Sequence, residues 1–470
     1  MKKLAQSWKT RKVNWKIYVS TLTANLLLIS VGGLASWISP TITKLKSNST
    51  EENPLGSPIS TMSISMLGTI PLISKLLSYI VMAKLSQAFG RKKLMLYGAV
   101  CLSVALIGIA FARNIYVYYI FLLIEGVGLS SVYISVPIYC SEVADTSNRG
   151  VIGCFIGLFS VCGILLMYVF GSFLSIKMFT LICAFPALVH IILHMVVIES
   201  PIYLISKGKK IEARRALESL RLNRTHQEIE TEYSALEKSV ESDISKNILD
   251  FKSVLELFKI RAGVKAFFIS VTLCIGQQAS GIAIIIMYVG PIFNKSGANI
   301  SGNNVGIIIG SAQVLTFAVA GCLIEKLGRR PLTLFSSFGC CLFLFAMGIS
   351  LYLIDIHVCF IAEIRWLPIL FVILFIICYG LGLGPIPTFI FGELFPHDFR
   401  SIGTALVLII NDILMSGMSF SFPILSEAFG APTCMVAYSS VSLLFFIVLY
   451  IFLPETKGKT LNEIQDLLNK

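Results

Sequence analysis

Charged residues are scarce in this chain: Asp, Glu, Lys and Arg make up 14% of its 470 residues, against about 25% in an average soluble protein. Hydrophobic residues make up 56%, and the mean hydropathy is +0.82. A surface so poor in charge is unsuited to water, which excludes an ordinary soluble globular protein. The composition predicts a membrane protein that crosses the bilayer many times.

The motifs of common enzymes are also missing. The sequence holds no phosphate-binding GxxxxGK[ST] loop and no zinc-spaced His/Cys set, and its five histidines are scattered. Most of the twelve cysteines fall inside apolar runs, where cysteine behaves as a small hydrophobic residue. We therefore expect no catalytic residue, no metal site, no cofactor and no disulfide framework.

Long apolar runs, by contrast, are abundant. A helix needs about 20 apolar residues to cross a hydrocarbon core of ~30 Å. The runs predict an all-α membrane protein with twelve transmembrane helices in two six-helix bundles, separated by a charged segment of short surface helices. The predicted spans are 17–38, 59–83, 94–112, 115–137, 150–171, 178–198, 262–290, 303–324, 331–353, 366–390, 401–424 and 432–453. The predicted domains are an N-terminal bundle (1–200), a cytoplasmic linker (201–261), a C-terminal bundle (262–453) and a cytoplasmic tail (454–470).

Basic residues gather on one side of these spans. They lie in the N-terminus, in GRKK (Gly90–Lys93), in the linker, in EKLGRR (Glu325–Arg330) and in the tail. The positive-inside rule therefore places both termini in the cytoplasm. The net charge of +12 is explained by these membrane-flanking segments. We therefore expect the chain to contact the lipid bilayer of the plasma membrane and not to bind nucleic acid.

Two Asn-x-Ser/Thr sequons fall in loops predicted to face outwards. They begin at Asn48 and Asn299 and are predicted to carry glycans. A third sequon, at Asn223, lies in the cytoplasmic linker and is expected to stay bare.

Two sequence devices recur at corresponding places in the two halves. A Gly-Arg turn follows the second span and the eighth, and a Glu with an Arg seven residues later follows the fourth and the tenth. Such repetition indicates an internally duplicated transporter. Ion pairs near the surface are worth only ~0–1 kcal/mol each, which suits a cytoplasmic gate that opens in every cycle. The predicted gate residues are Arg91, Glu142, Arg149, Glu325, Arg329, Arg330, Glu393 and Arg400.

Four segments resemble the sugar porter family of the major facilitator superfamily, with an overall look closest to insect facilitated trehalose and glucose transporters. They are ESPIYLISKGKKIEA (Glu199–Ala213), QQASGI (Gln277–Ile282), GLGPIPTFIFGELFPHDFRS (Gly382–Ser401) and PETKGKTLNEI (Pro454–Ile464). The resemblance implies two six-helix bundles around a central cavity, where a sugar at the midplane is exposed to each side in turn.

The adjacent carboxamides of Gln277 and Gln278 are unusual in an apolar span. A carboxamide both donates and accepts hydrogen bonds, which suits sugar hydroxyls; the alternative is a hydrogen bond between membrane helices. The resemblance favours contact with a ligand. The predicted substrate-binding residues are Gln277, Gln278, Gln313, Asn411, Tyr288 and Thr388.

The chain also departs from the family's pattern. Ala283 stands where the family usually has Asn, and Thr388 where it has Trp. These changes are compatible with a wider cavity for a disaccharide, or with altered transport. The first span has no acid between Ile17 and Pro40, where proton-coupled members usually carry Asp.

Passive transport of a hexose or a trehalose-like disaccharide is therefore the leading hypothesis. A proton-coupled symporter using Asp412 or Glu125, and a sugar sensor that does not transport, remain as alternatives. Lys75 in span two and Asp412 in span eleven are unexpected charges at similar depth. We predict that they form an ion pair inside the membrane.

Overall fold

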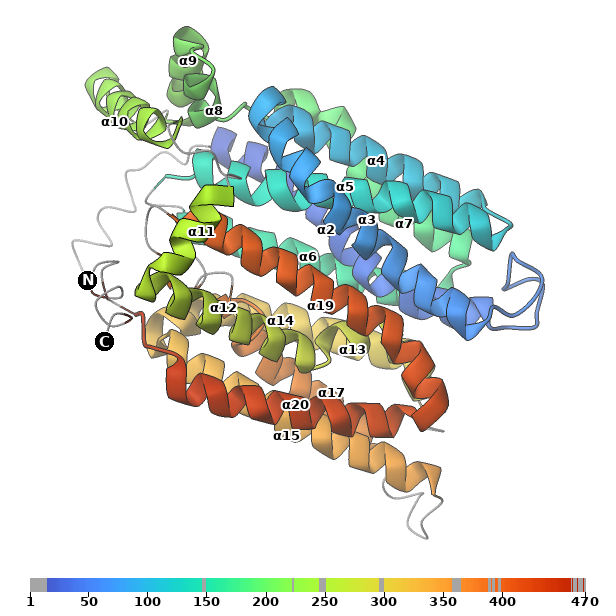
Figure 1. Cartoon of the computed structure of the whole chain (residues 1–470). Coiled ribbons are helices and arrows are strands. Elements are labelled where there is room, and N and C mark those ends of the chain that lie inside the picture. Colours follow the sequence, from blue (N-terminus) through green and yellow to red (C-terminus); the bar gives the residue numbers. More distant parts are fainter. Residues whose placement is uncertain are drawn as a thin grey trace, which may run out of the picture.

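The computed structural model describes residues 15–145, 149–221, 224–244, 251–295, 300–356, 365–387, 390, 394–395, 399–457, 459, 463 and 468. Within these residues, every regular element is a helix. Two helical bundles lie side by side with their long axes roughly parallel, and α2 begins at the end of the molecule at which α20 ends (Figure 1).

The N-terminal half is a bundle of six long helices. Helix α2 packs against α6, and α5 packs against both α3 and α4. The bounds are α2 Trp15–Leu45, α3 Thr61–Phe89, α4 Arg91–Phe111, α5 Ile115–Val143, α6 Arg149–Phe173 and α7 Ile176–Leu193.

The C-terminal half repeats this plan. Its first span is broken into α12 and α13, and α15 packs against both α17 and α20. The bounds are α12 Arg261–Ala279, α13 Ile282–Lys295, α14 Gly302–Leu327, α15 Arg329–Asp355, α17 Leu367–Leu381, α19 Arg400–Phe429 and α20 Ala431–Phe452.

In the described part of the chain, eleven helical segments are long and apolar enough to cross a membrane. The exception among the predicted spans is 366–390, where α17 is shorter because the chain turns at Gly382–Pro385. Proline has no N–H to continue the helical ladder. The prediction of an all-α protein with many membrane spans is confirmed.

Glycine ends a helix at the same point of each half. Gly90 separates α3 from α4 with φ 96° and ψ 167°, and Gly328 separates α14 from α15 with φ 98° and ψ 169°. A residue with a side chain is strained at such a positive φ. The two Gly-Arg motifs therefore make the same tight turn between consecutive membrane helices.

Four helices form the segment between the halves. The first three share a small apolar core that includes Leu204, Leu217 and Tyr233. Arg221 is buried and donates hydrogen bonds to the carbonyls of Val143 and Ala144 at the end of α5. The linker is thereby fixed to the N-terminal half. Its helices are α8 Pro201–Ser206, α9 Lys210–Leu220, α10 His226–Ile244 and α11 Phe251–Lys259, preceded by the short η1 His194–Val196.

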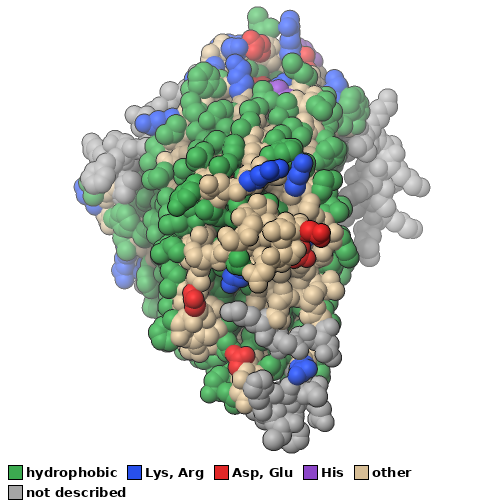
Figure 2. Space-filling model, turned by 90° about the vertical axis from the view of Figure 1, so that its right-hand side faces the viewer, with side chains coloured by type: hydrophobic (Ala, Val, Ile, Leu, Met, Phe, Trp, Pro, Cys, Tyr) green, Lys and Arg blue, Asp and Glu red, His purple; other side chains and the backbone are tan. Residues whose placement is uncertain are grey.

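The outer surface is apolar. Large side chains such as Phe173, Leu77 and Ile192 are more than 70% exposed, which is the expected state of residues that face lipid. Figure 2 views the molecule from the right-hand end of Figure 1, and hydrophobic side chains cover most of the flanks in this view.

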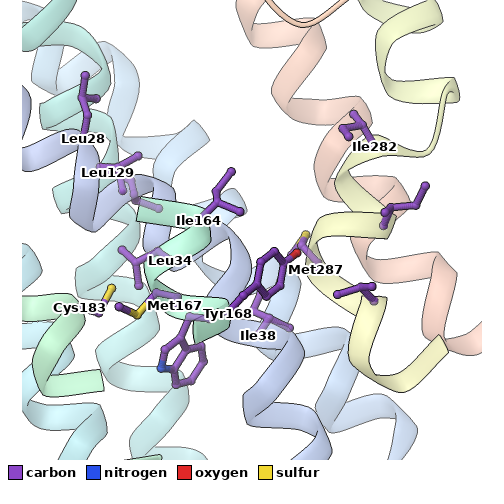
Figure 3. Packing of buried hydrophobic residues seen from close by; sticks show 14 of the residues in the cluster. Leu28, Leu34, Ile38, Leu129, Ile164, Met167, Tyr168, Cys183, Ile282 and Met287 are labelled. Atoms are coloured by element: carbon purple, nitrogen blue, oxygen red, sulfur yellow. The ribbon is translucent and has the colours of Figure 1, made fainter. Parts of the chain in front are cut away.

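Buried apolar side chains also join the two halves. Tyr168 of α6 reaches from the N-terminal half towards Met287 of α13 (Figure 3). Its hydroxyl donates a 2.6 Å hydrogen bond to the carbonyl of Ile286. The core is thus continuous between the halves at this level.

Candidate functional site

The seventh span breaks directly after its two glutamines. Helix α12 ends at Ala279 and α13 begins at Ile282, with Gly281 at φ 76° between them. The Ser280 hydroxyl donates to the carbonyl of Gln277 over 2.6 Å. The break falls at Ser280 and Gly281 and divides the seventh span into two half-spans.

The carboxamides at the break face two other helices. Gln278 Nε2 donates to Asn411 Oδ1 of α19 over 2.9 Å. Gln277 Nε2 donates to the hydroxyl of Tyr379 over 3.1 Å and to the carbonyl of Leu383 over 2.8 Å. The structure thus brings Gln277, Gln278 and Asn411 together where α12, α17 and α19 meet.

Gln278 and Gln313 each have a buried amide oxygen that lacks a donor. Neither Gln278 Oε1 nor Gln313 Oε1 has a hydrogen-bond partner among the described residues. The side chains are buried, at 6% and 3% exposed. A buried acceptor left unpaired costs about 1–3 kcal/mol, and a sugar hydroxyl can supply the missing donor.

Tyr288, another predicted site residue, lies away from this group. The Tyr288 hydroxyl donates to the carbonyl of Ser419 over 3.1 Å, and its ring packs on Phe422. Tyr288 lines a cavity of about 260 Å³, together with Asp355, Glu427 and other residues of both halves. The cavity lies towards the end of the molecule that carries the loop between α2 and α3, which is named the outer end. Thr388 falls outside the described residues.

Lys75 and Asp412 meet between the halves. Lys75 Nζ of α3 lies 3.0 Å from Asp412 Oδ1 of α19, and both residues are 5% exposed. The ammonium also lies 4.3 Å from the ring centroid of Tyr133 and 5.6 Å from that of Tyr79. A lone charge at this depth costs ~2.5–3.5 kcal/mol on insertion scales, and the partner carboxylate and ring faces offset part of that cost.

A second carboxyl group is buried in the N-terminal half. Glu125 of α5 is 3% exposed, and its Oε2 has no hydrogen-bond partner within the described part of the chain. An isolated ionised carboxylate is very costly in an apolar interior, so such a group takes up a proton instead.

At the end of the molecule that carries the Gly-Arg turns, Glu142 pairs with Arg91. Arg91 Nη2 donates to Glu142 Oε1 over 2.8 Å and so joins α4 to the end of α5. The arginine expected from sequence spacing, Arg149, has a side chain outside the described set. Arg330 Nη2 donates to the carbonyl of Tyr450 over 2.9 Å. The side chains of Glu325 and Arg400, and the whole of Glu393, also lie outside the described residues.

Two glutamates without a predicted role occupy matching positions beside the Gly-Arg turns. Glu199 Oε1 accepts from the backbone N–H of Lys92 over 3.2 Å. Glu455 accepts from the N–H groups of Arg329 and Arg330, each over 3.1 Å. Burial raises the pKa of the Glu199 carboxyl, although hydrogen bonds from the N–H groups of Ser200 and Lys92 lower that pKa in part.

Each glutamate therefore caps the positive N-terminal end of a membrane helix. The sequence signal is that Glu199 and Glu455 follow the sixth and twelfth spans, which are corresponding places in the two halves.

At the outer end, polar backbone contacts close the seam between the halves. The N–H of Gly290 in α13 donates to Ser39 Oγ of α2 over 2.8 Å. Asn48, a predicted glycan site, is exposed in the loop between α2 and α3. Asn299 and Asn223 lie beyond the described residues.

Two helical halves with a broken seventh span are the features of the major facilitator superfamily fold. Solved structures of the Escherichia coli xylose transporter XylE share it. The inward-open form gives a TM-score of 0.77 at 20% identity, covering 96% of this chain and 99% of that one. The proton:xylose symporter XylE bound to 6-bromo-6-deoxy-D-glucose gives 0.74 at 21% identity, with the same coverage.

The sequence model of the Sugar (and other) transporter family matches residues 18–468, and the chain belongs to that family. This is a family of transporters and not of enzymes. The facilitated trehalose transporter Tret1 of Drosophila erecta is 29% identical over 453 residues, 96% of this chain and 52% of that protein. Tret1 of Apis mellifera ligustica is 28% identical over 449 residues, 95% of this chain and 87% of that protein. The chain thus spans about half the length of the Drosophila relatives.

Proposed function

We propose that this chain is a passive carrier of a small sugar, a hexose or a trehalose-like disaccharide, that works by alternating access. It acts in the plasma membrane with both termini in the cytoplasm. Family membership, the sugars named for the similar proteins, and the polar groups at the break of the seventh span all support this proposal.

The observation that carries the proposal is the pair of buried amide oxygens without donors, Gln278 Oε1 and Gln313 Oε1. Together with Gln277 and Asn411, they offer a sugar both donors and acceptors from three helices. Four to six hydrogen bonds of about 1 kcal/mol each give an affinity near millimolar. Such weak binding allows quick release on the far side of the membrane.

Release also requires that the cytoplasmic end open. The contacts there are short-range polar ones: Arg91 with Glu142, and the helix caps made by Glu199 and Glu455. Pairs near the surface are individually weak. Each of these contacts joins segments of one half, so we propose that the network orders the helix ends within each half and rearranges when this end opens.

Coupling to protons is a second candidate, and one observation favours it. Glu125 is buried and its Oε2 has no partner in the described part of the chain, so it is suited to carry a proton. The sequence of the first span favours the passive mode, since it offers no acid there. An uncoupler that collapses the proton gradient separates the two: passive uptake is unaffected, whereas coupled uptake falls.

The decisive experiment is transport in a cell that lacks hexose uptake. The chain is expressed there, and counterflow of a panel that includes glucose and trehalose is measured against cells with an empty vector. Counterflow of at least one sugar is expected. Sugar binding to the purified protein without counterflow would indicate a sensor, and neither binding nor counterflow would refute the proposal.

A further inference from the structure

Several helix pairs join the two halves of the molecule. Helix α3 packs against α19, α6 packs against α14, and α2 packs against α13. Lys75 is the central residue of α3 (Thr61–Phe89), and Asp412 lies near the middle of α19 (Arg400–Phe429). The Lys75–Asp412 ion pair is therefore a contact between the halves at mid-depth in the membrane.

The contacts nearer the outer end are of another kind. Gly68 lies one heptad from Lys75, and a Cβ built on it would come within 2.6 Å of Ser419 Oγ. Farther along, the N–H of Gly290 donates to the Ser39 hydroxyl. Water can replace hydrogen bonds to hydroxyl and N–H groups when the outer end opens, so these contacts can separate in every cycle.

Water does not replace the Lys75–Asp412 ion pair in this way. On the N-terminal side, the rings of Tyr133 and Tyr79 lie beside the Lys75 ammonium. On the C-terminal side, Lys75 is the one cation paired with Asp412 among the described residues. If α3 and α19 parted here, Asp412 would be left as an unpaired anion inside the membrane, where charge is poorly solvated.

We propose that the Lys75–Asp412 contact is the pivot of the transport cycle. The halves rock about it, and the pair stays closed in both the inward-facing and the outward-facing state while the outer contacts open. This inference rests on alternating access as the proposed function. Rotation about mid-depth moves the helix ends most and the centres least, and Gly68 lies about 10 Å along the helix from Lys75.

The pivot also positions the sugar site. Asn411 precedes Asp412 on α19, and its Oδ1 accepts from Gln278. An α19 that is fixed at Asp412 keeps Asn411 at the same depth as the halves rock. Lys75 and Asp412 are thus positioning residues, and they need not touch the sugar.

The test is the accessibility of an outer-seam cysteine to a membrane-impermeant thiol reagent. Thr43→Cys is the reporter, because Thr43 is half-buried on α2 and would meet a side chain at Gly290. In the Lys75→Met/Asp412→Asn background, the labelling rate per surface molecule is expected to stay within about twofold of the reporter alone. The matched control is Ser39→Ala, which weakens the outer seam and is expected to raise labelling severalfold.

A rise in labelling in the double variant as large as that caused by Ser39→Ala would overturn the pivot, because it would mean that the pair holds one state closed. The exchanged variant Lys75→Asp/Asp412→Lys guards against a double variant that does not fold; it should reach the surface and label like the reporter alone. Absence of both variants from the surface would also refute the pivot. A pivot requires two matched side chains, but it does not require that the positive one lie on α3. The labelling rate is measured without sugar. Failure of sugar counterflow in the unmodified protein would therefore contradict the proposed function and not the pivot.

Discussion

At the scale of single residues, Gln278 is fixed at one end of its carboxamide and open at the other. Its Nε2 is committed to Asn411, while its Oε1 lacks a partner among the described residues. The hydrogen bond fixes the orientation of the amide plane before a sugar arrives. The site is thus partly preorganised, and less ordering is required on binding.

Replacing either partner should weaken transport. We predict that Gln278→Ala or Asn411→Ala lowers initial uptake about tenfold at low sugar concentration, as the loss of ~1.4 kcal/mol would, with normal surface protein. The matched control is Gln227→Ala, since Gln227 is exposed on the linker helix α10. Normal uptake in both site variants would show that the sugar binds elsewhere.

The charge pair makes a prediction that does not depend on sugar. Lys75→Met alone and Asp412→Asn alone should each lower the folded yield more than the two together, because each single change leaves a buried charge uncompensated. The measurement is a double-mutant cycle on monodisperse protein after extraction. If the double variant is as poor as the sum of the singles, no energetic coupling exists between the two residues.

Matching depth in the membrane, with the packing of spans two and eleven in the fold that the sequence resembles, brought Lys75 and Asp412 together from the sequence. Partners across helices were harder to predict, as Glu142 shows. Spacing along the chain suggested Arg149, whose side chain lies outside the described residues, and the structure places Arg91 of α4 on the Glu142 carboxylate. A sequence period identifies residues on one face of a helix, but it does not identify which neighbouring helix that face meets.

At the scale of elements, the break in the seventh span was predictable because serine and glycine follow two polar side chains within an apolar run. The early end of α17 was less predictable from the sequence. The hydropathy of 366–390 is continuous, but glycine and proline at Gly382–Pro385 turn the backbone. Hydropathy predicts which residues can lie in the bilayer, but it does not predict where the helical hydrogen bonds end.

The break depends on the conformation of Gly281. At φ 76°, an alanine would cost about 1–2 kcal/mol, so Gly281→Ala should straighten or strain the span and lower the maximal transport rate severalfold. The matched control is Gly276→Ala one turn earlier, where an added Cβ meets only ordinary contacts. Equal rates for both variants at equal surface level would show that the bend is not needed for transport.

At the scale of the whole molecule, the sequence predicts which end faces the cytoplasm, whereas the arrangement of the helices alone does not determine it. The linker helices α8, α9 and α10 lie at one end and the exposed Asn48 loop at the other (Figure 1). A loop in the exterior passes through the compartment where glycans are added, and one in the cytoplasm does not.

Glycan analysis therefore tests the orientation directly. Expressed in an animal cell, the protein should shift to higher gel mobility on glycosidase treatment, through Asn48, Asn299 or both. Asn48→Gln/Asn299→Gln should remove the shift, and Asn223→Gln should leave it unchanged. A shift that survives the double change but is lost with Asn223→Gln would invert the predicted topology.

The attachment of the linker has a consequence for how the protein can be made. Arg221 fixes the linker to the carbonyls of Val143 and Ala144, and the apolar core of α8, α9 and α10 is its own. A chain cut between α10 and α11 would leave these helices with the first half as a finished unit. Two separately translated polypeptides, inserted independently and paired afterwards along α3/α19 and α6/α14, would then suffice to assemble the carrier.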